Sequence, residues 1–380
     1  MPTIEQVLTA PPPALIPGEI DPEALFHEAR RRERRRRLTW LVGSLLVASV
    51  IGLAVAAATG VILHRSHAPN SPRVANLPEG RVVPLELAGP LTVSANGSLY
   101  VVDEKRHDIV TRTPGGAFRV VAGDGKSGSA GDGGPATKAE LSNVTDLAFA
   151  PNGDLYLADG GRIRVVDHEG TIHSIAGNGR PVREITNGTP ARDAALKGYD
   201  LSLAFSPSGQ LYIGTQLQLL RLMPNGTLET VRAVVRTGVV RGNLTDFGQL
   251  AFDKNGDIYV ATGFRGWSLF EVAPNGIATY IGYARRSGGS ISDLATTASG
   301  QVEAESGSSI LNLSGDQINT RYTFGNVPGT NWFTLTYFAF APNGALYADD
   351  IGTSGFQRYQ QLLTVQAGHI TQLWRHRVWN

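Results

Sequence analysis

The chain has 380 residues, with 34 Lys and Arg against 33 Asp and Glu, so its formal net charge is only +1. It contains no cysteine, which excludes disulfide bonds and thiolate metal sites. Eight Arg and six acidic residues fall in residues 1–69, and the 26 basic and 27 acidic residues of the remainder nearly balance. We therefore expect no nucleic-acid partner.

Residues 1–37 are predicted to form a cytoplasmic tail. The first 20 residues are rich in Pro and Ala without a period, which predicts disorder. Seven of the eight residues 30–37 are Arg. A run of this kind is usually solvated, and binding to an acidic lipid surface or a nucleic acid is the sharper alternative.

Residues 38–63 are predicted to be a transmembrane helix. These 26 residues carry no charge, and about 20 apolar residues cross a hydrocarbon core of roughly 30 Å. A cleaved signal peptide is the alternative, but its apolar region is shorter and closer to the N-terminus. Because the Arg cluster precedes the span, the positive-inside rule places the N-terminus in the cytoplasm and the remainder outside.

Residues 64–80 contain Pro69, Pro72 and Pro78 and are predicted to be a linker that spaces the next domain from the membrane. From residue 81 to residue 380 the chain repeats. The stretch 143–179 reads as four short strands separated by Asn-Gly and Glu-Gly turns.

Each repeat is anchored by a turn glycine that is followed, two residues later, by a short β run. The anchors are Gly97, Gly153, Gly209, Gly256, Gly300 and Gly344, separated by 56, 56, 47, 44 and 44 residues. A single four-stranded sheet cannot bury both faces, whereas six sheets stacked radially can. The sequence therefore predicts an all-β fold, a six-bladed β-propeller preceded by a single transmembrane α-helix.

Two details of the predicted propeller are open to test. The fifth repeat is the weakest, because Val302-Glu303 replaces the usual Leu-Tyr pair. Residues 81–86 form an extra strand that we expect to complete the last blade and close the ring. The alternative is that residues 369–374 supply the last strand and the ring closes by packing.

The sequences VVAGDG, GDGGPATKAEL and NGDLYLAD, followed by RIRVVD and TIHSIAGNG, resemble those of bacterial, more narrowly actinobacterial, NHL-repeat propellers. The resemblance covers about residue 81 to the C-terminus. It implies an interaction platform, in some relatives the outer sensor of a receptor kinase. The chain also resembles, more distantly, six-bladed propellers that are metal-dependent lactonases or lyases, and that resemblance implies an axial metal shell.

Recurrent acids suggest two roles. Asp103, Asp159 and Asp349 end the second strands of their repeats, and we expect them to accept backbone N–H groups at the turns. The start of each innermost strand lines one mouth of the central channel. Counting seven residues back from each anchor gives Pro90, Asp146, Ser202, Gln249, Asp293 and Tyr337.

Ligand-binding candidates at this channel mouth are Asp146, Asp200, Asp246, Asp293, Trp332, Phe333 and Tyr337. Several carboxylates around one opening suit Ca²⁺ or a basic ligand, or else they cap turns. Aromatic side chains supply much of the energy at binding surfaces, or else they pack between blades. The motif at residues 123–128 fits G-x-G-x-x-G, but no helix follows it, so nucleotide binding is not expected.

The sequence therefore predicts a single-pass protein of the cell membrane that presents a propeller outside the cell. Its predicted role is recognition of a protein, peptide or cell-envelope ligand. The alternative is a metal-dependent lactonase-like or lyase-like enzyme that uses the axial carboxylates Asp146, Asp200, Asp246 and Asp293.

Overall fold

The computed structural model describes residues 77–198, 201–235, 242–262, 268–283, 291–314, 317–324, 332–354 and 357–379. The predicted tail, the predicted membrane span and the linker up to residue 76 lie outside the described residues. Within the described ranges, no helix combines the length and the hydrophobicity that crossing a membrane requires.

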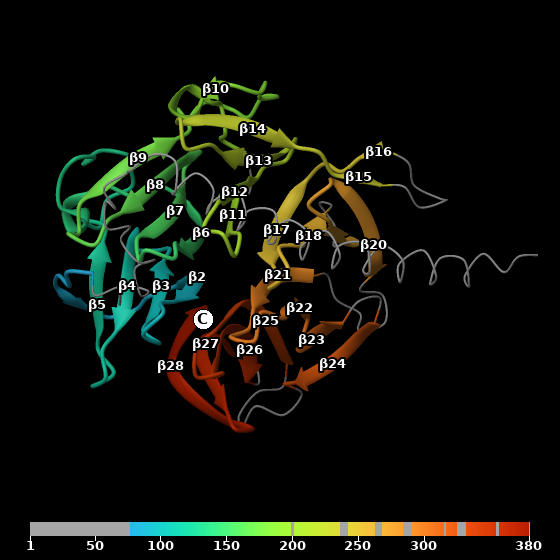
Figure 1. The fold of residues 1–380 in the computed structure, drawn as a ribbon. Coiled ribbons are helices and arrows are strands. Elements are labelled where there is room, and N and C mark those ends of the chain that lie inside the picture. The colour runs from blue at the N-terminus through green and yellow to red at the C-terminus, as the bar shows by residue number, and fades with distance from the viewer. Residues whose placement is uncertain are drawn as a thin grey trace, which may run out of the picture. The chain divides into compact units, whose positions relative to one another are not determined.

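The described strands form six sheets, each built on a four-stranded antiparallel meander from consecutive sequence (Figure 1). This confirms the all-β, six-bladed propeller. The strands of blades one to three are β2 (Ala88–Val93), β3 (Leu99–Asp103), β4 (Asp108–Arg112), β5 (Phe118–Ala122), β6 (Val144–Phe149), β7 (Leu155–Asp159), β8 (Arg162–Val166), β9 (Ile172–Ala176), β11 (Ser202–Phe205), β12 (Leu211–Gly214), β13 (Leu219–Leu222) and β14 (Thr227–Val231).

Blades four to six follow the same order, and their strands become longer towards the C-terminus. They are β17 (Phe247–Phe252), β18 (Ile258–Thr262), β19 (Ser268–Val272), β20 (Ile277–Tyr283), β21 (Ile291–Thr296), β22 (Val302–Ser306), β23 (Ser309–Ser314), β24 (Gln317–Thr323), β25 (Trp332–Phe340), β26 (Leu346–Ser354), β27 (Gln357–Gln366) and β28 (His369–Trp379).

Short elements connect these blades or extend their outer edges. Proline precedes each of the two 3₁₀ turns. These elements are β1 (Val82–Val83), η1 (Ala136–Lys138), β10 (Thr189–Pro190), η2 (Ala191–Asp193), β15 (Val234–Val235) and β16 (Gly242–Asn243).

The repeat motif explains how neighbouring blades pack. The anchor glycines turn the chain with positive φ, 90° at Gly153 for example, a conformation that glycine adopts without steric cost. The tyrosine that follows then meets the phenylalanine that ends the next inner strand. Tyr100–Phe149, Tyr156–Phe205 and Tyr212–Phe252 are edge-to-face pairs, each with ring centroids 4.9 Å apart.

The inner strands β2, β6, β11, β17, β21 and β25 contact one another in that cyclic order, so the ring closes where β25 meets β2. The prediction that residues 81–86 complete the last blade is wrong. Val82 and Val83 of β1 pair with β5 of the first blade, because β28 already occupies the outer edge of blade six beside β27.

Side chains hold this closure. The Gln360 side-chain amide accepts the Ala88 N–H at 3.0 Å and donates to the Ala88 carbonyl at 2.5 Å. It also donates to Asp349 at 2.9 Å. A buried apolar cluster shared by blades one and six lies around this contact. The ring therefore closes by packing and side-chain hydrogen bonds.

The acids that end the second strands have the predicted structural role in two blades. Asp103 accepts the Glu86 N–H at 2.8 Å, and Asp159 accepts the Ser142 N–H at 2.7 Å. In blade six the corresponding acceptor is Asp350, which bonds the Thr334 N–H at 3.2 Å. Asp349, which the sequence assigned to this role, bonds the Gln360 amide instead.

Candidate functional site

All six inner strands line one central channel, which contains a cavity of about 290 Å³. The count of seven residues back from each anchor identifies the lining in five blades, at Pro90, Asp146, Gln249, Asp293 and Tyr337. In blade three the corresponding Ser202 is fully buried. Most of the other side chains along the lining are apolar, so the aspartates, Gln249 and Tyr337 are among its few polar side chains.

Asp146 and Asp293 make the same pair of hydrogen bonds three blades apart. Asp146 Oδ1 accepts the Leu147 N–H at 2.7 Å, and Oδ2 accepts the N–H of Leu203, in the next blade, at 2.7 Å. Asp293 Oδ1 accepts from Leu294 at 2.8 Å, and Oδ2 accepts from Phe338 of the next blade at 2.8 Å. Each carboxylate therefore ties one inner strand to its neighbour.

The local backbone explains these bonds. The pairing register shifts between Val144 and Asp146, and again between Ile291 and Leu294, and such a bulge leaves a backbone group out of the ladder. The inner strand is also the edge of its sheet, so it presents unpaired N–H groups towards the channel. An aspartate at the bulge satisfies both kinds of donor.

Burial raises the pKa of both channel carboxyl groups. It raises the pKa of Asp146 to about 7. The pKa of Asp293 lies well above its usual value, first because of burial and also because the Asp146 charge repels its own. The charge of Asp146 therefore acts on Asp293 across the channel, and near neutral pH the pair carries less than its full negative charge.

The chemistry of the described lining is poor in metal ligands. Ca²⁺ prefers six to eight oxygen ligands, and both oxygens of each channel aspartate already accept backbone N–H groups. Within the ranges that the structure describes, no three His, Asp or Glu side chains lie close enough together to hold a metal ion.

The other predicted residues are more scattered. Tyr337 lines the channel and is half-buried against the cluster of blades one and six. Asp246 precedes β17 at φ 59°, its N–H donates to the Gln216 carbonyl at 2.8 Å, and it is not part of the channel lining. Asp200 lies outside the described residues. Trp332 and Phe333 begin β25, but their side chains lie outside the described part.

The structure thus brings together Asp146, Asp293 and Tyr337 from the predicted set. Whether they contact a ligand stays a prediction.

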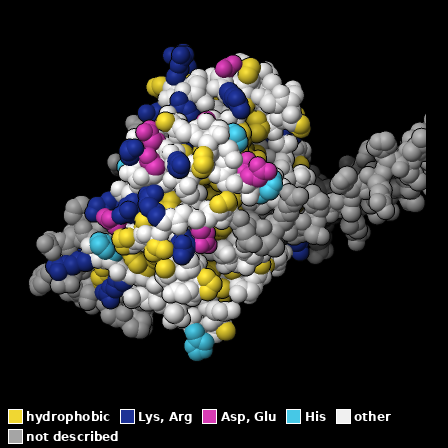
Figure 2. Space-filling model, turned by 90° about the vertical axis from the view of Figure 1, so that its left-hand side faces the viewer, with side chains coloured by type: hydrophobic (Ala, Val, Ile, Leu, Met, Phe, Trp, Pro, Cys, Tyr) yellow, Lys and Arg dark blue, Asp and Glu magenta, His cyan; other side chains and the backbone are white. Residues whose placement is uncertain are grey.

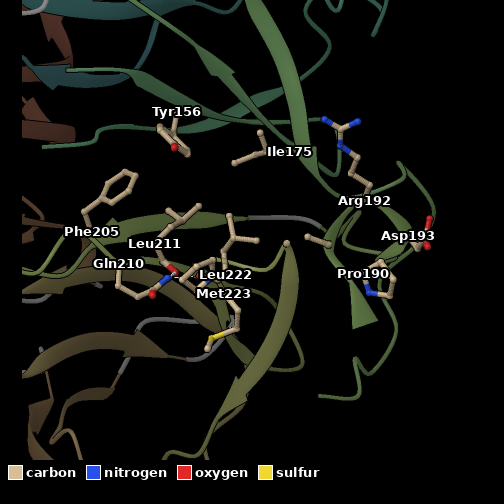
Figure 3. Close-up of a pocket in the computed structure, with 14 residues that line it drawn as sticks. Tyr156, Ile175, Pro190, Arg192, Asp193, Phe205, Gln210, Leu211, Leu222 and Met223 are labelled. Carbon is tan, nitrogen blue, oxygen red and sulfur yellow. Dashed lines mark hydrogen bonds between the residues drawn. The ribbon is translucent and has the colours of Figure 1, made fainter. Parts of the chain in front are cut away.

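A second concave surface was missed by the sequence analysis. A groove of about 620 Å³ lies between blades two and three, and its apolar side chains point towards one another in Figure 3. The sequence signal was available in part, since the anchor tyrosine Tyr156 and the loop that contains Arg192 both line the groove.

Charged side chains of both signs lie on the visible surface (Figure 2). On the face shown in Figure 2, Lys and Arg side chains are interspersed with Asp and Glu. Two surface ion pairs of blade one illustrate this mixing, Arg106–Glu86 at 3.0 Å and Arg119–Glu79 at 3.3 Å.

Comparisons with known proteins support the NHL-like propeller. Residues 114–185 match the family model described as the Teneurin NHL domain. Teneurin-m of Drosophila melanogaster is 28% identical over 156 residues, which are 36% of this chain and 6% of that protein. The match thus spans a small part of the relative's length.

Solved propellers are similar at low identity. A virginiamycin B lyase from Staphylococcus aureus is 12% identical, with a TM-score of 0.46 over 78% of this chain and 87% of the lyase. A gluconolactonase from Xanthomonas campestris is 15% identical, with a TM-score of 0.45 over 74% of this chain and 90% of that one. Similarity at this level carries no argument about activity.

Proposed function

We propose that this chain is a single-pass membrane protein that presents its NHL-like propeller outside the cell as a recognition module for a protein, peptide or cell-envelope ligand. One observation carries the choice of recognition over catalysis. Both oxygens of Asp146 and both oxygens of Asp293 accept backbone N–H groups. The channel acids therefore act as clamps within the ring.

The membrane part of the proposal rests on the sequence. Residues 38–63 carry no charge and follow a cluster of seven Arg. A segment of this length spans a bilayer, and its flanking charges keep the N-terminus inside the cell.

The topology is testable because the chain has no cysteine. Single cysteines at Thr3, in the predicted tail, and at Asn225, in an exposed turn of blade three, are labelled with a membrane-impermeant maleimide. We expect intact cells to label Asn225→Cys only, and Thr3→Cys to react after permeabilisation. The reverse pattern, or propeller released into the medium, would contradict the anchored topology.

Catalysis by an axial metal is tested separately on the full chain in detergent micelles. We expect Ca²⁺ titration to give no saturable heat and no change in melting temperature. Saturable Ca²⁺ binding together with lactone hydrolysis would overturn the recognition role.

A further inference from the structure

The same arrangement of side chains recurs between blades one and two, blades two and three, and blades three and four. Each groove so formed is built from the second-strand tyrosine of one blade, the inner-strand phenylalanine of the next, and a turn glycine of that next blade. The three turn glycines are Gly170, Gly226 and Gly276, with φ between 78° and 81°. Because the walls are built from the same residue types each time, the chain segment that fills one groove indicates what another groove can hold.

The groove between blades one and two is filled by the chain itself. Leu77 is 5% exposed and packs in one cluster with Tyr100, Val121 and Leu155. Pro78 follows it closely over the turn, since a Cβ on Gly170 would lie 2.7 Å from Pro78 Cγ. Residues 77–80, which the sequence assigned to the linker, are therefore part of the propeller.

The groove between blades three and four is filled as well. Ala233 is 3% exposed and packs in the cluster that contains Phe252. A Cβ on Gly276 would lie 2.7 Å from the Arg232 carbonyl oxygen. In both filled grooves, one residue of the chain lies over the turn glycine, and its neighbour in sequence is buried in the adjacent apolar cluster.

The groove between blades two and three has the same walls without such an occupant among the described residues. Tyr156, Ile175 and Leu211 correspond in sequence to Tyr100, Val121 and Leu155 of the filled groove. They line the cavity of about 620 Å³ from both sides (Figure 3). A Cβ on Gly226 would meet nothing within 4 Å. Tyr156, Ile175, Phe205 and Leu222 stay half-buried.

Charge distinguishes the open groove from the filled one. Glu79 follows Pro78 and pairs with Arg119, and Gly80 then lies over Thr137, whose Cγ2 is 3.1 Å from a Cβ built on that glycine. At the position of Thr137, the second loop carries Arg192. Arg192 is exposed, lies at the groove rim in Figure 3, and makes no ion pair within the described part of the chain. The open groove therefore offers an unpaired cation near the position of Glu79.

We infer that the groove between blades two and three binds an extended segment of a partner protein, in which an apolar residue precedes proline and an acidic residue follows it. The inference rests on the proposed recognition function and names the class of partner. Proline suits the site because it needs no backbone acceptor and its φ is fixed before binding. The apolar side chain would fill the cavity as Leu77 fills its own, and the acid would face Arg192.

Two other occupants fit less well. A second copy would have to offer its Leu77-Pro78 segment, which is already buried in its own propeller. Residues 15–19 of the same chain read Leu-Ile-Pro-Gly-Glu, but the proposed topology places them across the membrane from the groove.

The test uses the full chain in detergent micelles and a fluorescent peptide with the sequence of residues 74–82, VANLPEGRV. We expect saturable binding by fluorescence anisotropy, weakened at least tenfold when Leu and Pro of the peptide are both replaced by Ala. Leu222→Arg, which charges the half-buried groove wall, should abolish binding. Leu217→Arg is the matched control, because Leu217 is an exposed leucine of the same blade outside the groove lining.

A charge reversal tests the acidic position. Arg192→Glu should weaken binding of VANLPEGRV about fivefold to tenfold and strengthen binding of the variant peptide VANLPKGRV by a similar factor. An effect on folding alone would lower the affinity for both peptides.

Several results would overturn the inference. One is the absence of binding at millimolar peptide, and another is equal binding to the Leu222→Arg and Leu217→Arg variants. Tighter binding after deletion of residues 1–37 would assign the groove to the chain's own tail. Self-association that Leu222→Arg abolishes would assign it to a second copy. All these readouts use purified protein, so they are independent of the cell-labelling result that tests the proposed topology.

Discussion

Blades two and five each carry a carboxylate at the start of the inner strand and another on the second strand. Asp146 and Asp293, on the inner strands, make matching pairs of backbone hydrogen bonds. On the second strands the two blades differ. Blade two has Asp159 at the end of β7, whereas blade five has Glu303 and Glu305 within β22.

Blade two neutralises its buried acid with a buried cation. Arg164 is 0% exposed and donates to Asp159 at 3.1 Å, to Asp132 at 2.8 and 3.0 Å, and to the carbonyls of Glu140 and Ala130. Every N–H of this guanidinium thus has an acceptor. Burial still raises the pKa of Asp159, but the Ser142 N–H and Arg164 oppose that shift.

In blade five, the buried carboxyl groups of Glu303 and Glu305 are only partly paired or hydrogen-bonded. Glu303 pairs with the exposed Arg321, but its Oε2 atom has no hydrogen-bond partner among the described residues. Glu305 accepts a hydrogen bond from the Ser292 hydroxyl, and within the described ranges its Oε1 atom has no partner. Burial raises the pKa of Glu305 to about 8. The comparison shows two ways to bury an acid in one fold, by pairing the charge or by suppressing its ionisation.

The largest expected effect comes from breaking the pairing in blade two. Arg164→Met removes five hydrogen bonds and leaves Asp159 buried without its cation, which typically costs about 3–5 kcal/mol. We expect the free energy of unfolding, measured by urea denaturation, to fall by that amount. Arg183→Met is the control, because Arg183 is exposed, and it should change stability by less than about 0.5 kcal/mol. Equal losses in the two variants would contradict the pairing.

The next largest expected effect is a pH dependence of the free energy of unfolding, caused by Glu305 of blade five. The pKa of Glu305 rises from 4.5 to about 8 on folding, so between these values the folded chain retains a proton that the unfolded chain has released. The stabilisation that the retained proton gives the folded chain is therefore lost as the pH rises from 4.5 to about 8. Glu305→Gln removes the titration, and its stability relative to the parent should grow from pH 5 to pH 8 by on the order of 1–4 kcal/mol.

Urea denaturation at several pH values between 5 and 8 measures this difference. Glu169→Gln, in an exposed turn of blade two, is the matched control and should follow the parent at each pH. A constant difference between Glu305→Gln and the parent would mean that Glu305 titrates alike in the folded and unfolded chains.

Local turn chemistry made the blades predictable from sequence. The third of the four strands predicted within residues 143–179 is present as β8 (Arg162–Val166), because the Gly and Asp residues that bound it act within a few residues of the chain. Blade five forms although Glu303 replaces the tyrosine of the motif. Its strands still pair, and Arg321 of the same blade supplies the counter-charge. The repeat motif describes only one short stretch of each blade, so it cannot show that a change at Glu303 is compensated by Arg321 elsewhere in the blade.

Contacts between distant parts of the chain were not predictable. The count from the anchors placed Asp146 in the channel, but its second hydrogen-bond donor lies 57 residues away in the next blade. The interpretation of residues 64–80 as a spacer missed Leu77, whose burial depends on walls contributed by blades one and two. The prediction that residues 81–86 close the ring failed for the same reason. The edge of β5, with which β1 pairs instead, is a feature of the assembled sheet.

The smallest expected effect tests the device that blades two and five share. Asp146→Asn and Asp293→Asn each keep the shape of the side chain but replace one acceptor oxygen with an NH₂ group. Either the Leu203 or the Phe338 N–H then loses its partner, at about 1–3 kcal/mol. The double variant should lose less than the sum, because Asp146→Asn also removes the charge that raises the pKa of Asp293.

Asp246→Asn separates this clamp role from a general need for acids near the inner strands. Asp246 lies outside the channel lining and holds a positive φ, which Asn tolerates well, so the change should leave the urea midpoint within error of the parent. If Asp146→Asn and Asp293→Asn were as neutral as Asp246→Asn, their oxygens would not be holding neighbouring inner strands. The two carboxylates would then be available to a ligand, and the ground for choosing recognition over axial chemistry would be lost.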